Sequence, residues 1–166
     1  MLRPVEPGDL EPFTAIWNDP AVMRHMGRGT RSAAECRLRV EELIEHQRRH
    51  GFGKWTVVER ATGETIGYCG IELYEGGPDV EVGFSFARSA WGRGYATEAA
   101  RAWLEHGFAR LGFERVLALV DPANVASIRV LDKLGLAPVG RTNVRNHEWL
   151  LYEARARESA ETVTSS

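Results

Sequence analysis

A short glycine loop, Gly92-Arg93-Gly94, is the part of this sequence whose residues could most clearly bind a ligand. It follows Val80–Phe86, which alternates like a strand, and precedes a helix-patterned stretch from Ala96 to Leu111 that Gly112 would close. The first amides of a helix have no carbonyl partners, and the helix dipole is positive there. Together these features predict an anion site, most often for phosphate. A plain turn is the simpler alternative, because many strand-to-helix turns contain glycine.

Three kinds of phosphate site can be compared with this loop. A P-loop requires Gly-x4-Gly-Lys-Ser/Thr, and the sequence contains no such string. A dinucleotide site requires a third glycine where Thr97 stands, although Asp121, after the next predicted strand, could contact a ribose. A dinucleotide-dependent oxidoreductase therefore stays open as an alternative. The third kind of site holds the pyrophosphate of coenzyme A.

Two stretches resemble motifs of the GNAT acetyltransferases. Trp91-Gly92-Arg93-Gly94-Tyr95-Ala96-Thr97-Glu98-Ala99 is similar to the family's glycine loop, especially in the branch of the Rim-type acetyltransferases that modify ribosomal-protein N-termini. Trp91 departs from the Arg or Gln usual at its position. The stretch from Asn124 to Leu136 resembles the second motif, Asn-x-x-Ser/Ala with a Gly-Phe-like pair closing the helix, and Leu136 replaces the aromatic residue. The order and spacing of these motifs over residues 56–136 point to this family.

The resemblance implies that acetyl-CoA enters between the central strand, Val80–Phe86, and the next strand. The backbone amides of Gly92 to Thr97 would hold the pyrophosphate, and the backbone of Phe84 and Phe86 would pair with the pantetheine as an added strand does. Asn124 would contact the pantetheine or hold the strands apart. The implied cofactor-binding residues are Phe84, Phe86, Gly92, Arg93, Gly94, Tyr95, Ala96, Thr97 and Asn124. Coenzyme A would leave as the product.

The implied reaction is direct attack of a primary amine on the thioester. A lysine amine has a pKa of about 10.4 and an α-amine one of about 8, so an α-amine needs less help to lose its proton. Glu81 is the first candidate for the general base and Glu72 the second, although either could be an ordinary strand residue. Leu131 stands where many GNAT enzymes have a tyrosine acid. Ser127 is therefore the candidate acid, with helix capping as its alternative role.

The acceptor is a protein N-terminal α-amine or a small-molecule amine, and the sequence does not decide between them. We expect its pocket to form from residues 17–28 and 141–147, which include Trp17, His25, Asn143 and His147. A non-catalytic acyl-CoA-binding module is an alternative function, which would need neither Glu81 nor Ser127. A homodimer is also left open.

The elements that must position these residues form an α+β fold. We predict a GNAT-like mixed, splayed, mostly antiparallel sheet with helices on both faces. Strands are expected at residues 2–5, 55–60, 65–73, 80–86 and 115–120, near Val139, and at 148–156. Helices are expected from Asp9 as a cap, from Pro20, from the capping box at Ser32, from Ala96 and from Val125. Leu38 and Val125 are expected on buried helix faces.

Composition limits the other classes of function. The chain has 166 residues, of which 43% are hydrophobic and 27% charged, and we expect a single acetyltransferase domain over residues 1–156 and a disordered tail over 157–166. A net charge of −2 gives no global attraction for nucleic acid, and no stretch has the pattern of a signal peptide or membrane span. Cys36 and Cys69 fit a reducing cytoplasm. His46 and His50 have zinc spacing but no evident third ligand, so we expect no metal.

Overall fold

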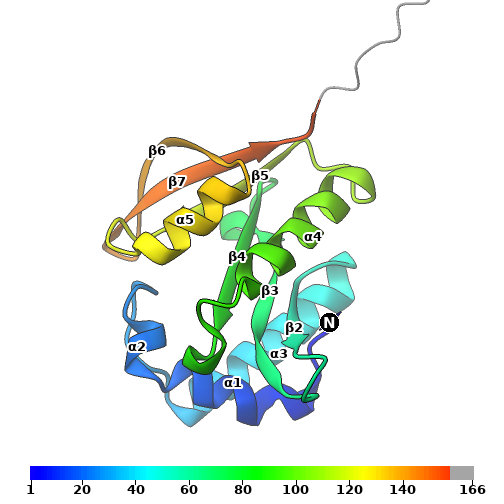
Figure 1. Ribbon diagram of the computed structural model, residues 1–166, viewed down its shortest axis with the longest axis vertical. Coiled ribbons are helices and arrows are strands. Elements are labelled where there is room, and N and C mark those ends of the chain that lie inside the picture. Colours follow the sequence, from blue (N-terminus) through cyan, green and yellow to red (C-terminus); the bar gives the residue numbers. More distant parts are fainter. Residues whose placement is uncertain (158–166) are drawn as a thin grey trace, which may run out of the picture.

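Seven strands form one mixed sheet in the order β1-β2-β3-β4-β5-β7-β6 (Figure 1). The computed structural model describes residues 1–157, so nearly all of the predicted tail lies outside the described residues. Only β4 and β5 are parallel, and every other neighbouring pair is antiparallel. The strands are β1 (Leu2–Arg3), β2 (Lys54–Val58), β3 (Thr65–Leu73), β4 (Val80–Phe86), β5 (Arg115–Val120), β6 (Ala137–Val144) and β7 (His147–Arg155). The predicted mixed, mostly antiparallel sheet is confirmed.

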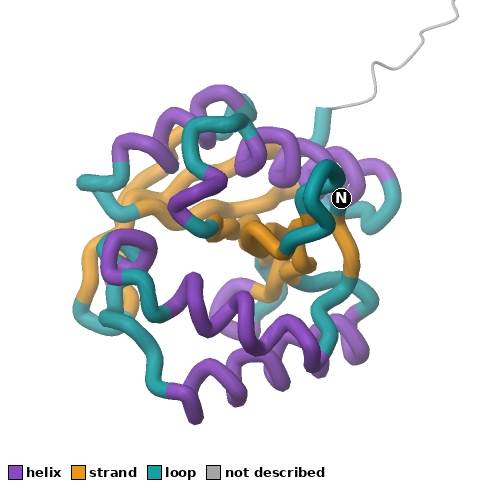
Figure 2. The backbone as a smooth tube through the Cα atoms, turned by 60° about the horizontal axis from the view of Figure 1, so that its bottom comes forward, coloured by secondary structure: helices purple, strands orange, loops and turns teal. Residues whose placement is uncertain are grey.

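Helices cover both faces of this sheet (Figure 2). They are α1 (Leu10–Trp17), α2 (Pro20–Met23), α3 (Ala33–His50), α4 (Tyr95–Ala109) and α5 (Val125–Lys133), with short 3-10 turns η1 (Pro7–Asp9), η2 (Tyr74–Gly76) and η3 (Arg88–Ala90). One core packs α4 and α5 against the strands around Ile71, Trp103 and Val116. The other packs α1 and α3 around Phe13 and Leu43, and Tyr68 of β3 belongs to it.

The register of β3 and β4 determines which residues face each group of helices. Side chains alternate between the two faces of a strand, and residues directly opposite each other project to the same face. Val80, Val82 and Phe86 of β4 are buried in the core of α4 and α5. The residues between them face α1 and α3 together with their partners on β3, in the pairs Ser85–Tyr68, Gly83–Gly70 and Glu81–Glu72. The α3 face of the sheet is therefore polar at this point.

Local signals set most helix ends as expected. Ser32 and Glu35 form the predicted capping box at the start of α3, and Gly51 ends this helix with a φ of 75°. Asp19 accepts a hydrogen bond from the Ala21 amide and caps α2. Asp9 does not cap α1, because its carboxylate instead accepts hydrogen bonds from Arg3, the Glu6 amide and Thr56.

Two residues predicted to be buried are exposed. Leu38 is 56% exposed because the buried side of α3 runs through Cys36, Val40 and Leu43, and Leu38 lies on the other side of the helix. Val125 is 54% exposed because it is the first residue of α5, which packs on the core only from Ile128 onward. Within residues 1–157 no helix combines the length and the hydrophobicity that crossing a membrane requires.

Candidate active site

A cavity opens where β4 and β5 separate. The two strands pair at a single position, Glu81 opposite Leu117, whereas β4 pairs with β3 along its whole length. The cavity has a volume of about 1250 Å³, and its walls include Val82 to Phe84 of β4 and Ala118 to Val120 of β5. The sheet is therefore splayed between these strands, as the sequence predicted.

The glycine loop lies beyond the carboxyl end of β4. Gly92 and Gly94 have φ angles of 71° and 81°, a left-handed conformation that favours glycine. An added Cβ would meet no atom within 4 Å at either position. Glycine is therefore favoured there by the backbone conformation and not by a lack of space. Gly94 is the N-cap of α4, and its carbonyl accepts the Glu98 amide at 3.0 Å. The amides that follow Gly94 thus open α4, which is the geometry of an anion site.

The side chains of this loop are held by Glu59, a residue that sequence reasoning missed. The Tyr95 hydroxyl donates to Glu59 Oε1 at 2.6 Å, and an Arg93 guanidinium nitrogen lies 2.7 Å from the same oxygen. Thr62 donates to the other oxygen at 2.9 Å, and the Arg93 guanidinium also lies over the Tyr95 ring. These contacts lower the pKa of Glu59. Arg93 and Tyr95 therefore point toward the turn between β2 and β3, which leaves their backbone amides for an anion.

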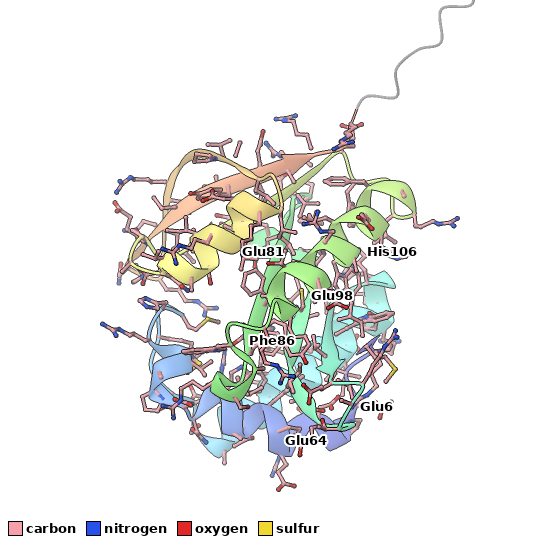
Figure 3. All side chains as sticks on the ribbon, viewed as in Figure 1. Glu6, Glu64, Glu81, Phe86, Glu98 and His106 are labelled. Atoms are coloured by element: carbon pink, nitrogen blue, oxygen red, sulfur yellow. The ribbon has the colours of Figure 1, made fainter. Side chains whose placement is uncertain are left out.

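The two phenylalanines proposed for pantetheine binding differ in position. Phe84 lines the cavity, whereas Phe86 is buried in the core and its carbonyl accepts the Trp91 indole N–H at 2.9 Å. Glu81 and Phe86 lie toward opposite ends of β4 (Figure 3). The glycine loop is outside the cavity walls, so the candidate cofactor residues form two groups, one at the cavity and one beyond Phe86.

Glu72 and Glu81 lie opposite each other on β3 and β4, but their surroundings differ. The Glu72 carboxylate lies 2.7 Å from Lys54 Nζ and accepts two hydrogen bonds from Arg39, at 2.8 and 3.0 Å. Burial alone would raise the pKa of Glu72, but Lys54 and Arg39 lower it to about 2. Among the described residues Glu81 makes no ion pair, and burial raises its pKa despite nearby Lys54. Of the two base candidates, Glu81 is thus the one that keeps proton affinity.

Asn124 and Ser127 approach the cavity from the other side. Asn124 Oδ1 accepts the Ser127 amide at 3.1 Å, so Asn124 supplies the cap of α5. The Ser127 hydroxyl is not the cap, and Ser127 lines the cavity together with Leu131. The hydroxyl of Ser127 and the side-chain amide of Asn124 thus belong to residues of the cavity wall.

The predicted acceptor segments are only partly at the cavity. His25 and Asn143 line it, but Trp17 is 1% exposed and donates to the Tyr68 hydroxyl at 3.2 Å. Trp17 is therefore a core residue, contrary to the expectation. His25 Nδ1 and His147 Nε2 lie 3.5 and 3.2 Å from Asp121 Oδ2. Asp121 thus lies between the segment that follows α2 and the β6–β7 hairpin.

His46, one of the two histidines on α3, joins the segment after this helix to β3. His46 Nδ1 lies 2.9 Å from the Phe52 carbonyl, and the Leu73 amide donates to Nε2 at 3.3 Å. This arrangement requires a neutral ring with the proton on Nδ1, and burial lowers the pKa of His46 accordingly. No group of three or more potential metal ligands occurs within the described part of the chain.

Residues 1–137 match the family model described as an acetyltransferase (GNAT) domain, and the chain belongs to this family. YkkB, an uncharacterized protein of Bacillus subtilis (strain 168), is 40% identical over 126 residues, which are 75% of this chain and 73% of YkkB. A GNAT-family acetyltransferase from Bacillus anthracis superposes with a TM-score of 0.82 at 25% identity, covering 95% of each chain. Spermidine N-acetyltransferase from Vibrio cholerae, solved with CoA and spermine, shares the fold at 18% identity, with a TM-score of 0.76 and coverage of 94% and 95%.

The protein is thus an acetyl-CoA-dependent N-acetyltransferase. The oxidoreductase alternative is wrong, and Asp121, its proposed ribose ligand, is instead placed between two histidines. The alternative of a non-catalytic acyl-CoA-binding module is likewise replaced by that of an enzyme.

Proposed function

We propose that the protein acetylates a primary amine by direct attack in a ternary complex, with both substrates meeting in the cavity between β4 and β5. The observation that carries this proposal is the position of Glu81. This residue lines the cavity at the single point where β4 and β5 pair. The amine nitrogen would bond to the thioester carbonyl carbon and its proton would pass to Glu81. The carbon–sulfur bond would then break, and the thiolate would take a proton.

Acetyl-CoA would occupy the α5 side of the cavity. Its pyrophosphate would bind the amides from Gly92 to Thr97, which the left-handed glycines leave free of nearby side chains. Its pantetheine would pass between β4 and β5, beside Phe84 and Asn124. Arg93 and Tyr95 would contribute through their backbone, because their side chains are held by Glu59.

Glu81 is the proposed base because its raised proton affinity suits it to accept a proton from the attacking amine. Its pKa is raised by burial, and a base works best when its pKa approaches the operating pH. Glu72 would stay charged throughout and hold Lys54 and Arg39 in place. Ser127 is the proposed donor to the leaving thiolate, because Asn124 already caps α5 and leaves the hydroxyl available.

The acceptor class is a small-molecule amine or a protein N-terminus. The spermidine acetyltransferase of the same fold supports a small amine, and the lower pKa of an α-amine supports a peptide or amino acid. A panel of amines with acetyl-CoA, read by mass spectrometry of the product, tests both.

The decisive variant is Glu81→Gln, with Glu64→Gln on the exposed β2–β3 turn as the matched control (Figure 3). Loss of general base catalysis should lower kcat by about 10²–10⁴-fold and flatten the rise of kcat/KM with pH. Acetyl-CoA affinity should stay unchanged. A Glu81→Gln enzyme with the pH profile of the parent would exclude Glu81 as the base.

A further inference from the structure

Arg31, in the loop between α2 and α3, is a cation on the cavity wall without a counter-charge. It is half-buried, and its Nε is buried without a hydrogen-bond partner. Within residues 1–157 it makes no ion pair. Its guanidinium is stacked over the Trp17 ring, 5.2 Å from the ring centroid, and Trp17 is itself fixed in the core. The position of this charge is therefore set by packing, and no carboxylate of the described chain neutralises it.

Three other cations of the cavity wall, Arg28, Arg39 and Lys54, already have partners. Arg28 lies 2.7 Å from a Glu35 oxygen, and Arg39 lies within 3.2 Å of both Glu42 and Glu72. Lys54, deeper in the cavity, is paired with Glu72. Burial lowers the pKa of Arg31, and repulsion by Arg28 lowers it further. A guanidinium kept among like charges in a partly buried site is stabilised when an anion arrives.

We infer that Arg31 binds an anionic group of the acceptor, a carboxylate or phosphate oxygen pair, while the amine of the same molecule lies at Glu81. This inference rests on the proposed function. A guanidinium presents a planar fork of donors that matches carboxylate and phosphate oxygens in a bidentate manner. The acceptor is thus an amino acid, a short peptide or an amino phosphate, and a polyamine would instead bring a second cation against Arg31.

The positions of the two groups on the sheet limit the length of such an acceptor. Arg31 stacks on Trp17, whose indole donates to the Tyr68 hydroxyl, and Glu81 lies opposite Glu72. Tyr68 and Glu72 are four residues apart on β3, which corresponds to about 13 Å along a strand. An acceptor with its amine and anion several bonds apart fits better than an α-amino acid.

The experiment compares acceptors that differ only in the anion. Glycylglycine is paired with glycylglycinamide, γ-aminobutyrate with butylamine, and phosphoethanolamine with ethanolamine, and kcat/KM is measured for each. The parent enzyme should prefer the anionic member of at least one pair by 10-fold or more. Arg31→Gln should abolish that preference, a loss of about 10-fold or more in kcat/KM for the anionic member, mainly through KM, as expected when one partner of a desolvated charge pair is removed. Arg31→Lys, which keeps the charge without the fork, should fall between them.

The control is Arg37→Gln, an exposed α3 residue outside the cavity wall, which should keep the parent preference. The peptide, carboxylate and phosphate pairs distinguish the possible sources of the anion. Acetylation of amines without any anion preference, or a preference that survives in Arg31→Gln, would overturn the role of Arg31 and leave the proposed function standing. Acetylation of no amine by a protein that binds acetyl-CoA would overturn the proposed function and the inference with it.

Discussion

Replacing Glu72 with glutamine should destabilise the protein by about 3 kcal/mol at pH 7. Glu72 is 8% exposed, and its carboxylate contacts both Lys54 and Arg39. Burial would raise its pKa, but these cations lower it from 4.5 to about 2. Each pKa unit corresponds to about 1.36 kcal/mol, so a shift of this size is worth about 3 kcal/mol. Loss of one partner from a buried ion pair typically costs about 3–5 kcal/mol, which agrees in magnitude.

The sign of the pH dependence follows from the direction of this shift. Because the pKa of Glu72 is lower in the folded state, its stabilisation is present above the unfolded value near 4.5 and is lost as the pH falls toward 2. The parent should therefore lose about 3 kcal/mol more than Glu72→Gln between pH 5 and pH 2. The difference between the two proteins should be largest at neutral pH and shrink in acid.

Urea unfolding at a series of pH values measures this difference, and thermal unfolding should show a decrease in Tm of about 6–12 °C for a chain of this size. Glu64→Gln, on an exposed turn, is the control and should lie within about 0.5 kcal/mol of the parent. The double variant Lys54→Met with Glu72→Gln should recover part of the loss, since it leaves one buried charge fewer. A Glu72→Gln variant within 1 kcal/mol of the parent at pH 7, or a difference independent of pH, would refute the reasoning.

Three further predictions concern the cofactor and the leaving group. Gly94→Val should weaken acetyl-CoA binding at least 10-fold in calorimetry while the fold is retained, because valine resists a φ of 81°; Gly8→Val, with open space and no positive φ, should bind normally. Glu59→Gln and Tyr95→Phe should each raise the Kd for acetyl-CoA by loosening the glycine loop. Unchanged affinity in both variants would mean that Glu59 stabilises only the turn between β2 and β3 and does not support cofactor binding. Ser127→Ala should lower kcat by about 10²-fold in a steady-state assay with acetyl-CoA affinity intact, and full activity would remove Ser127 as the acid.

The features that the sequence predicted correctly depend on short stretches of chain. The capping box of Ser32 and Glu35 with Gly51 defines α3 within its own residues, and Gly92 and Gly94 define the start of α4 in the same way. The alternation of β4 is visible because one face packs on α4 and the other is polar. β6 was expected only near Val139, because six of the eight residues in this edge strand, from Ala137 to Val144, are exposed and show no apolar alternation.

The missed features depend on contacts between distant segments. Glu59 meets Tyr95 36 residues later in the chain, and no local pattern marks either residue for the other. Trp17 was expected at the acceptor pocket because it belongs to residues 17–28. Its indole is instead buried in the core, where it donates a hydrogen bond to the Tyr68 hydroxyl. Leu38 is apolar and yet exposed, because the tertiary packing of α3 selects a different face.

The choice between the two carboxylates shows why such contacts decide chemistry. Glu72 and Glu81 occupy equivalent polar positions on paired strands, so their sequence surroundings do not distinguish them. Lys54 comes from β2 and crosses above Gly83, where an added Cβ would lie 3.0 Å from its Cε and 3.2 Å from its Nζ. Because Gly83 has no side chain, the lysine fits there and pairs with Glu72. One carboxylate is thereby kept charged. The other, Glu81, is buried beside it without an ion pair in the described chain and keeps the affinity for a proton on which its proposed role as the base depends.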